Sequence, residues 1–302
     1  MLTGAAALTA LLLAGHRLVP NRVGRLGSLL EVFLPWLGLL AAVLVGLALL
    51  YRSAAALLAL LLPVAAWTHH FGALLLPAPE PGPRELVVVQ HNVSDVNPDP
   101  AGTARALAAA DPDLIALQEL LPTALPVYEE TLAARFPHHV VRGTVGLWSK
   151  YPLTGARHLD IKPAGITEPW QRGLRAVAAT PYGDVAAYVA HLPSARVRAS
   201  GLASGWRDES AGLLGRAVAA EPVRAVVLLG DLNGTVDDRG LRPLTARLNT
   251  AERGFAFSFP GAFPVARIDQ VMARAATVRH VRTLPATGSD HLPVAARVRL
   301  GG

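Results

Sequence analysis

The stretch that decides the fold is Val226 to Asn233, which reads Val-Val-Leu-Leu-Gly-Asp-Leu-Asn. Its run of valines and leucines is typical of a strand that is buried on both faces of a sheet. Because strand side chains alternate with a period of two, Asp231 and Asn233 should leave the strand end on the same side. By itself the stretch is more simply read as an Asp-x-Asn turn, so the rest of the chain must decide whether it is a functional site.

The composition separates two parts of the chain. The 302 residues are 52% hydrophobic, and the apolar excess lies in the first quarter. The absence of cysteine excludes disulfides and thiolate metal sites. The net charge of +6 comes almost wholly from arginine, and from Glu85 onward 23 basic side chains face 20 acidic ones. This surplus of three is too small to predict a nucleic-acid groove.

Residues 1–76 are predicted to form a membrane module with three spans, at about 2–19, 29–50 and 54–76. The last two exceed the ~20 apolar residues that a bilayer crossing needs. The first is shorter, so a signal-like segment is the alternative. The protein is therefore expected in the cell membrane as a multi-pass chain. Arginines at 17, 22 and 25 oppose Arg52, and this charge bias favours a cytoplasmic C-terminal region.

A proline-rich linker at 77–84 separates this module from a predicted catalytic domain at 85–302. Short apolar runs predict strands at 86–89, 114–117, 145–148, 174–180, 185–190, 226–233, 268–273 and 294–300, the last as an edge or half-exposed strand. Helices are expected at 101–110, 123–136 and 209–220. Many short strands with few helices predict an α/β fold in which two packed sheets are covered by outer helices.

Polar residues recur where these predicted strands or turns end. The candidates are Asn92, Glu119, His191, Asp231 with Asn233, Asp269, and Asp290 with His291. One such residue is usually a cap or turn former, but the repetition favours a site. Oxygen-rich ligands without a thiolate suit Mg²⁺ or Mn²⁺ better than zinc.

These residues carry a family resemblance. Gln118-Glu119, Gly230-Asp231-Leu232-Asn233, Arg267-Ile268-Asp269 and Ser289-Asp290-His291 follow an early Asn92-Val93. In this order they resemble the endonuclease/exonuclease/phosphatase superfamily, which includes deoxyribonucleases, apurinic endonucleases and sphingomyelinases. The resemblance implies a four-layered α/β sandwich and metal-dependent phosphoester hydrolysis. The whole chain more loosely resembles actinobacterial VanJ-like membrane proteins, which would place the domain outside the cell, against the charge bias.

The resemblance also implies a role for each matched residue. Glu119 would be the main Mg²⁺ ligand, Asn92 would orient the metal site, and Asp290 would be a second metal contact. Asp231 would deprotonate the attacking water, and Asn233 would stabilise the charged phosphorus. His291, held by Asp269, would bind or protonate a phosphate oxygen, and His191 would donate to the scissile group. Arg172 and Arg175 lie before a strand and are weaker candidates for gripping a substrate phosphate bidentately.

The leading hypothesis is a membrane-anchored, Mg²⁺-dependent phosphoesterase whose substrates include lipid-linked phosphates or pyrophosphates. A membrane-bound nuclease is the alternative enzyme, disfavoured by the near-neutral domain. A catalytically inactive, membrane-held binding module is the alternative outside enzymes. The sequence does not indicate the oligomeric state.

Overall fold

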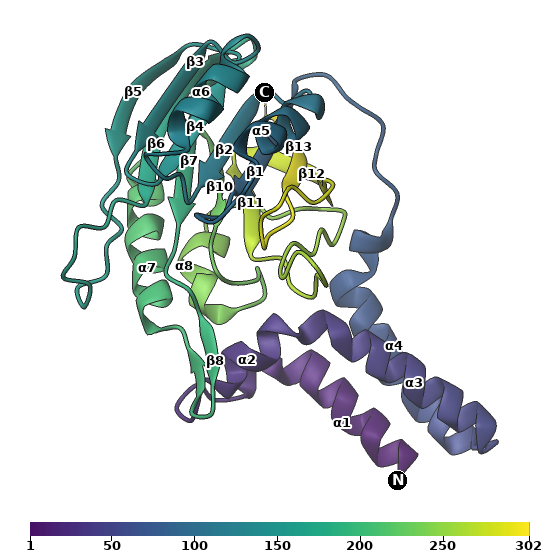
Figure 1. Ribbon diagram of the computed structural model, residues 1–302. Coiled ribbons are helices and arrows are strands. Elements are labelled where there is room, and N and C mark those ends of the chain that lie inside the picture. Colours follow the sequence, from purple (N-terminus) through teal and green to yellow (C-terminus); the bar gives the residue numbers. More distant parts are fainter. Residues whose placement is uncertain (302) are drawn as a thin grey trace. The chain divides into compact units, whose positions relative to one another are not determined.

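The computed structural model describes residues 1–301 and divides into two units (Figure 1). Unit 1 contains residues 1–76 together with two short segments from later in the chain, 196–203 and 237–239. Unit 2 contains the remaining described residues from Pro77 onward. Two loops of the predicted catalytic region therefore belong to the N-terminal unit.

Unit 1 is mainly helical. Its α-helices are α1 (Leu2–Gly15), α2 (Leu26–Val32), α3 (Leu37–Leu50) and α4 (Ala54–Phe71), joined by the 3₁₀ helices η1 (His16–Leu18), η2 (Leu34–Trp36) and η3 (Gly72–Leu75). The Ser53 hydroxyl caps α4 by accepting a hydrogen bond from the Ala56 amide at 3.3 Å. The continuous helix Ala54–Leu75 is long and apolar enough to cross a membrane.

The prediction of three spans is not supported. The stretch at 29–50 is not one helix, because it bends by 63° between α2 and the following helix. The break coincides with Pro35, which has no amide hydrogen to continue a helical ladder. The helix Leu2–Leu18 is apolar but shorter than a span. By length and composition the structure offers one spanning helix, or two if the bent pair forms one span.

The only acidic residue of the predicted second span, Glu31, is buried in α2. Its Oε1 lies 3.0 Å from Nδ1 of His16 and accepts a 2.9 Å hydrogen bond from Nη2 of Arg239. Its Oε2 accepts from Nε of Arg239 at 2.9 Å. A buried carboxylate needs such partners, and the forked guanidinium supplies a bidentate pair.

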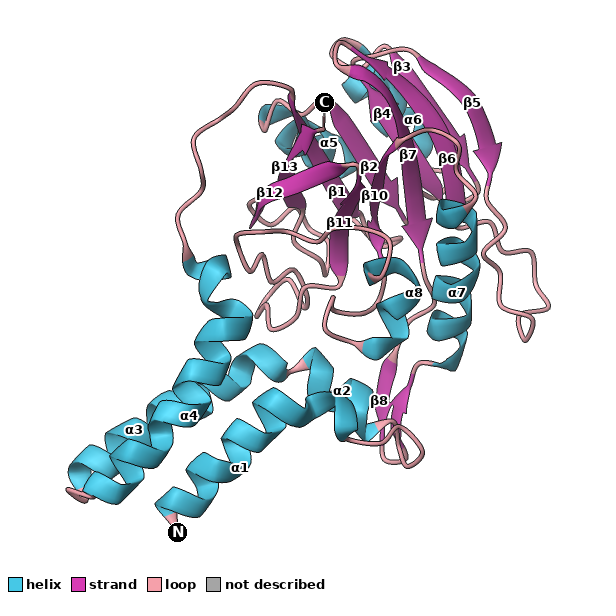
Figure 2. Cartoon of the chain, turned by 180° about the vertical axis from the view of Figure 1, so that it is seen from behind, coloured by secondary structure: helices cyan, strands magenta, loops and turns pink. Residues whose placement is uncertain are grey.

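Unit 2 contains two mixed sheets (Figures 1 and 2). The first has the order β12 (Ala276–Thr283), β13 (Val294–Leu300), β1 (Glu85–Asn92), β2 (Leu114–Gln118), β4 (Val145–Ser149) and β3 (His138–Arg142). The second has the order β11 (Asp269–Arg274), β10 (Ala225–Asp231), β7 (Gly183–His191), β6 (Gly173–Thr180) and β5 (Leu153–His158). The predicted α/β fold with two packed sheets is confirmed.

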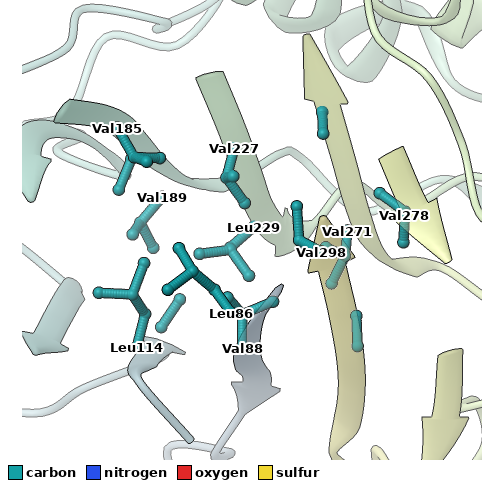
Figure 3. Close-up of a cluster of buried hydrophobic side chains, with 14 of the residues drawn as sticks. Leu86, Val88, Leu114, Val185, Val189, Val227, Leu229, Val271, Val278 and Val298 are labelled. Carbon is teal, nitrogen blue, oxygen red and sulfur yellow. The ribbon is translucent and has the colours of Figure 1, made fainter. Parts of the chain in front are cut away.

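The inner faces of the two sheets share one hydrophobic core (Figure 3). Leu86, Val88 and Leu114 contribute to it from the first sheet, and Val227 and Val271 from the second. Helices cover the outer faces: α5 (Pro100–Ala109) and α6 (Leu125–Ala133) pack on the first sheet. The helices α7 (Gly205–Ala219) and α8 (Arg242–Thr245) pack on the second. The apolar side chains on the inner face of these strands therefore pack into the core between the sheets.

Several strand assignments differ from prediction. The strand β13 is not an edge strand, because β12 and β1 pair with it on either side. Its alternating arginines suggested exposure, whereas Val294, Ala296 and Val298 face the core between the sheets. The strands β3, β5 and β12, which all lie at sheet edges, were not predicted. Their polar, arginine-containing sequences lack a continuous apolar run.

Candidate active site

Three predicted site residues form one row across the second sheet. Strand β10 runs parallel to β7 and antiparallel to β11, and Asp231 is in register with His191 on one side and Asp269 on the other. All three side chains follow the core-facing pattern of their strands, since the residue two positions away in each case belongs to the core between the sheets: Val189, Leu229 and Val271. The inner face of the second sheet is therefore apolar along most of its length and polar where this row of three residues lies.

The first sheet brings a second group to the same place. Strands β1 and β2 are parallel, with Asn92 in register with Gln118, so Asn92 and the following Glu119 lie at neighbouring strand ends. Nδ2 of Asn92 donates to Oε1 of Glu119 at 3.0 Å and to Oδ2 of Asp231 at 3.1 Å. The Asn92 amide therefore joins the two sheets at the site.

The loops that leave these strands adopt left-handed backbone conformations. The φ angles are 60° at Glu119, 48° at Asn233 and 62° at Ser94. Such angles are uncommon for residues other than glycine, and they concentrate at functional sites. At Asn233 the turn brings its amide 2.9 Å from Oδ1 of Asp231, while its Nδ2 donates to the Leu192 carbonyl at 2.9 Å. The turn thus holds both Asp231 and the Asn233 side chain in place.

His291 is held by a buried acid. Its Nδ1 lies 2.8 Å from Oδ2 of Asp269, which also accepts from the Ser258 hydroxyl at 2.6 Å. The other Asp269 oxygen accepts from the side-chain amide of Gln90. The Asp269 carboxylate therefore fixes the ring, with Nδ1 as the donor, and leaves Nε2 of His291 3.8 Å from Oδ2 of Asp231.

The His191 ring is buried beside an arginine. Its Nδ1 lies 3.4 Å from Nη1 of Arg172. A guanidinium can only donate, so Nδ1 accepts and the ring proton is assigned to Nε2. This Nε2 faces Oδ2 of Asp231 at 3.6 Å and Oε1 of Glu119 at 3.8 Å. Burial lowers the pKa of His191 well below its ordinary value, and Arg172 lowers it further. The ring is thus a neutral donor.

The site also shifts the protonation of Asp231 and His291. Burial raises the pKa of the Asp231 carboxyl above its ordinary value, although His291 opposes the rise. Burial lowers the pKa of the His291 imidazole, but the Asp269 and Asp231 carboxylates outweigh burial and raise it. A carboxylate that holds a proton more readily than usual, next to a cationic ring, suits general acid–base chemistry.

Two sets of residues could hold a metal ion: Asp231 with Asp269 and His291, and Glu119 with Asn92. Among the described residues, ligand atoms of Asp231, Asp269 and His291 lie within 4.8 Å of one another. The Asp269 oxygens, however, already accept from three side chains. The Glu119 side chain is 30% exposed, and its oxygens accept hydrogen bonds from the Asn92 side chain and the Asp95 amide. This oxygen-rich set fits Mg²⁺, which binds one or two carboxylates and retains water ligands.

Of the two predicted arginines, Arg172 lies at the site and Arg175 does not. Arg172 contacts His191, and the charges of Glu119 and Asp231 act on its guanidinium. Arg175 instead forms a buried pair with Glu221, through Nε at 2.9 Å and Nη2 at 2.6 Å. Its third donor, Nη1, binds the Gly155 carbonyl at 3.3 Å. The guanidinium is thus engaged in structural contacts, contrary to its predicted substrate role.

Asp290 is exposed and lies outside the potential metal cluster. Its predicted metal contact therefore gains no support, although its charge contributes to the raised pKa of His291.

Three residues that position the others, Gln90, Ser258 and Ser289, were given no role from the sequence. Gln90 and Ser258 donate to Asp269. The Ser289 hydroxyl donates to the Asn92 carbonyl at 2.7 Å and accepts from the His291 amide at 3.0 Å. Strand alternation could have identified Gln90, two residues before Asn92 on the same face. Ser258 lies in an irregular segment, where no periodic pattern applies.

A cavity of about 260 Å³ adjoins Glu119. Val93, Leu121, Ala124 and Tyr128 give it apolar walls, and Asp95 adds a carboxylate. No lysine or arginine is among its described lining residues. The described lining therefore offers no basic side chain to a second phosphate.

Two packed mixed sheets with this cluster of carboxylates, amides and histidines define a metal-dependent hydrolase of phosphoester bonds. Residues 89–291 match the Endonuclease/Exonuclease/phosphatase family, and the chain belongs to it. This confirms the broader resemblance inferred from the motifs. A comparison with curated proteins yields no match, and the narrower VanJ-like resemblance is not shown by the comparisons.

Solved structures share the fold at low identity. Sphingomyelinase C from Streptomyces griseocarneus is 19% identical, with a TM-score of 0.53 and coverage of 70% of this chain and 99% of that one. Staphylococcus aureus beta toxin, as a mutant with bound magnesium ions, is 15% identical, with a TM-score of 0.53 and the same coverages. D. rerio TDP2, complexed with a single-strand DNA product, is 17% identical, with a TM-score of 0.57 and coverage of 71% and 98%.

Proposed function

We propose that the protein is a membrane-anchored, Mg²⁺-dependent phosphoesterase that hydrolyses phosphate or pyrophosphate esters, including lipid-linked ones. The observation that carries the chemistry is the network in which Asn92 joins Glu119 to Asp231, with Nε2 of His291 3.8 Å from the same Asp231 oxygen. The apolar helix Ala54–Leu75 supports the anchor. An anchored enzyme would act on substrates at the bilayer surface.

In this proposal Asp231 orients the attacking water and accepts its proton, which the raised pKa of the carboxyl favours. Asn233 and neutral His191 are donors to the phosphoryl oxygens, as preorganised dipoles. His291, oriented by Asp269, donates to an oxygen as charge develops. Glu119 and Asn92 would hold a Mg²⁺ ion, which would supply Lewis-acid stabilisation of the phosphoryl group when bound.

The cavity beside Glu119 is proposed to receive the organic part of the ester. Its apolar walls and its lack of a basic lining residue support this assignment. An Ala124→Trp substitution should fill the cavity and raise the KM for p-nitrophenyl phosphate, with little effect on the KM for inorganic pyrophosphate. An equal rise in both KM values would contradict this assignment.

A nuclease remains the alternative enzyme, and the DNA product bound by the similar TDP2 structure favours it. Against it stands the surplus of only three basic side chains from Glu85 onward. Extended nucleic-acid binding depends on several basic contacts to phosphates. Degradation of plasmid DNA at rates comparable with phosphate release from lipid substrates would favour the nuclease.

The decisive experiment is a substrate panel of prenyl pyrophosphate, sugar phosphates and DNA, with purified full-length protein and Mg²⁺. Wild type is compared with Asp231→Asn, and Asp184→Asn, at an exposed position of β7, is the matched control. The proposal expects lipid pyrophosphate hydrolysis that Asp231→Asn abolishes and Asp184→Asn preserves. No turnover on any substrate and no Mg²⁺ binding by calorimetry would favour an inactive binding module.

The side of the membrane requires a separate test. The arginine bias favours the cytoplasm, whereas the looser family resemblance favours the exterior. We propose the cytoplasmic side from the residues themselves. A phosphatase tag at the C-terminus, active only after export, should therefore stay silent in cells.

A further inference from the structure

A short β-hairpin in unit 1 carries exposed arginines next to an exposed apolar residue. It consists of β8 (Arg196–Arg198) and β9 (Gly201–Ala203), with Val197 in register with Leu202. Arg196 and Arg198 are exposed, and Val197 between them is 66% exposed. The two faces of the hairpin differ, because Arg196 and Arg198 lie on one face, while Val197 shares the other face with its register partner Leu202, which is buried.

The hairpin is fixed to the connection between α1 and α2 (Figures 1 and 2). The Leu202 amide donates to the Gly24 carbonyl at 2.9 Å. Gly201 has a φ of 110°, and a Cβ there would lie 2.0 Å from the same carbonyl oxygen. This close backbone approach requires glycine at position 201. The hairpin is therefore packed against the connection at Gly24.

The connection contributes the same types of side chain. Arg17 and Arg22 are exposed, and each is followed by an exposed apolar residue: Leu18 at 86% and Val23 at 71%. We define the basic collar as these four residues with Arg196, Val197 and Arg198. The acidic residues of unit 1 do not offset it at the surface. Glu31 and Asp238 are buried, and Asp237 is only partly exposed.

We propose that the basic collar binds the headgroup region of an anionic lipid bilayer. This inference rests on the proposed membrane anchoring and specifies which lipid surface the anchored protein contacts. Arginines interleaved with apolar side chains suit the interface, where the guanidinium contacts lipid phosphates and the apolar group enters the acyl boundary. The exposed leucines of the neighbouring helices, such as Leu11 and Leu58, favour a lipid surface over an acidic protein.

The collar also has a position in the sequence that matters for catalysis. The hairpin begins five residues after His191, the last residue of β7. Docking at the interface would fix the chain segment that leaves this site strand. An anionic bilayer would therefore act both as the partner of the collar and as a restraint on that segment.

The chain contains no cysteine, so Val197→Cys gives a single labelling position in the full-length protein. The thiol is labelled with an environment-sensitive fluorophore, and the protein is reconstituted in phosphatidylcholine vesicles with or without phosphatidylglycerol. We expect blue-shifted emission and quenching by headgroup-proximal nitroxide lipids in the anionic vesicles. High salt should reverse both changes.

Adding Arg196→Gln and Arg198→Gln should lower the docked-to-free ratio roughly 25-fold, or about fivefold for each arginine. Arg52→Gln, which removes an exposed arginine of unit 1 outside the collar, should leave the ratio unchanged. Vesicle flotation and phosphate release are measured on the same samples. If the protein floats and hydrolyses substrate but the fluorophore emits as it does in water and is not quenched, the proposed role of the basic collar is overturned, and the other two proposals stand. Failure to float would overturn the anchor, and absence of hydrolysis would overturn the enzymatic proposal.

Discussion

Nδ1 of His291 lies 2.8 Å from Oδ2 of Asp269, and this buried pair fixes which ring nitrogen faces Asp231. An Asp269→Asn variant would keep the shape but replace the acceptor oxygen by a donor in one amide orientation. We expect kcat to fall by roughly 10²–10⁴ with little change in KM, because oriented proton transfer is lost. Steady-state kinetics on p-nitrophenyl phosphate measures this, with Asp184→Asn as the control. A variant of unchanged kcat would remove His291 from the proton-transfer role.

Asn233 combines a side-chain role with a left-handed backbone, and two substitutions separate them. Both Asn233→Gly and Asn233→Ala should reduce kcat by roughly 10²–10³ through loss of the amide donor. Glycine tolerates the φ of 48°, whereas alanine is strained, so the glycine variant should be more stable by about 1 kcal/mol. Thermal unfolding in detergent measures the difference. Equal stabilities of the two variants would show that the turn adopts another backbone conformation when alanine is present.

Removal of divalent metal should abolish hydrolysis reversibly. Dialysis against a chelator is expected to leave a folded, inactive protein, and Mg²⁺ or Mn²⁺ should restore activity. Glu119→Gln should raise the Mg²⁺ concentration for half-maximal activity at least tenfold, because it removes a carboxylate ligand. The matched control is Glu129→Gln, a carboxylate that pairs with His139 at 3.2 Å. If only Asp269 variants changed the Mg²⁺ requirement, the ion would belong to the Asp231, Asp269 and His291 set.

The Arg175–Glu221 pair predicts an acid-dependent loss of stability. Burial by itself raises the pKa of Glu221, but hydrogen bonds from Arg175 and Tyr188 outweigh it and lower the pKa from 4.5 to about 2. The folded state thus binds this proton more weakly than the unfolded state. The pair's contribution, on the order of 2–3 kcal/mol, is full above pH 4.5 and is lost as the pH falls towards 2.

Chemical denaturation in detergent across this pH window measures the loss. A Glu221→Gln variant should be less stable at neutral pH and should show a weaker pH dependence between 4.5 and 2. If the wild type and this variant lost stability in parallel, other carboxyl groups would account for the acid sensitivity.

Gly230 allows β10 and β7 to approach closely next to the site. A Cβ at this position would lie 2.0 Å from the Ala190 carbonyl oxygen. Gly230→Ala should therefore destabilise the protein by about 1–3 kcal/mol and reduce kcat, because the strand carrying Asp231 must shift. Gly212→Ala in helix α7 has space for the methyl group and should stabilise the protein by about 0.5–1 kcal/mol. Thermal unfolding should therefore show a lower stability for Gly230→Ala and a higher stability for Gly212→Ala than for the wild type.

The strand ends were predictable because apolar runs stop at identifiable polar residues. Asn92, Asp231 and Asp269 could be placed at such ends from sequence alone, and register then brought them together. The partners of the site residues were harder to predict. Ser258 reaches Asp269 from an irregular segment, and the contact depends on tertiary packing and not on local pattern.

The same limit applies to the N-terminal unit. Hydropathy identified its apolar helices but could not indicate the bend near Pro35 or the Glu31–Arg239 pair, whose members are 208 residues apart. The hairpin at 196–203 has no strong apolar run, so nothing in its sequence assigned it to this unit. Arg175 was misread for a related reason: an arginine preceding a site strand and one paired with a distant glutamate look the same in sequence.

The row formed by His191, Asp231 and Asp269 has a consequence for how this protein can change. Backbone hydrogen bonds between three adjacent strands set the spacing of these side chains. The segments that follow β7 beyond Leu192 and β10 beyond Asn233 are not part of that ladder, so their length and sequence can vary without altering the spacing. Loop exchange is therefore a practical route to new substrate selectivity in this scaffold, with the hydrolytic chemistry retained.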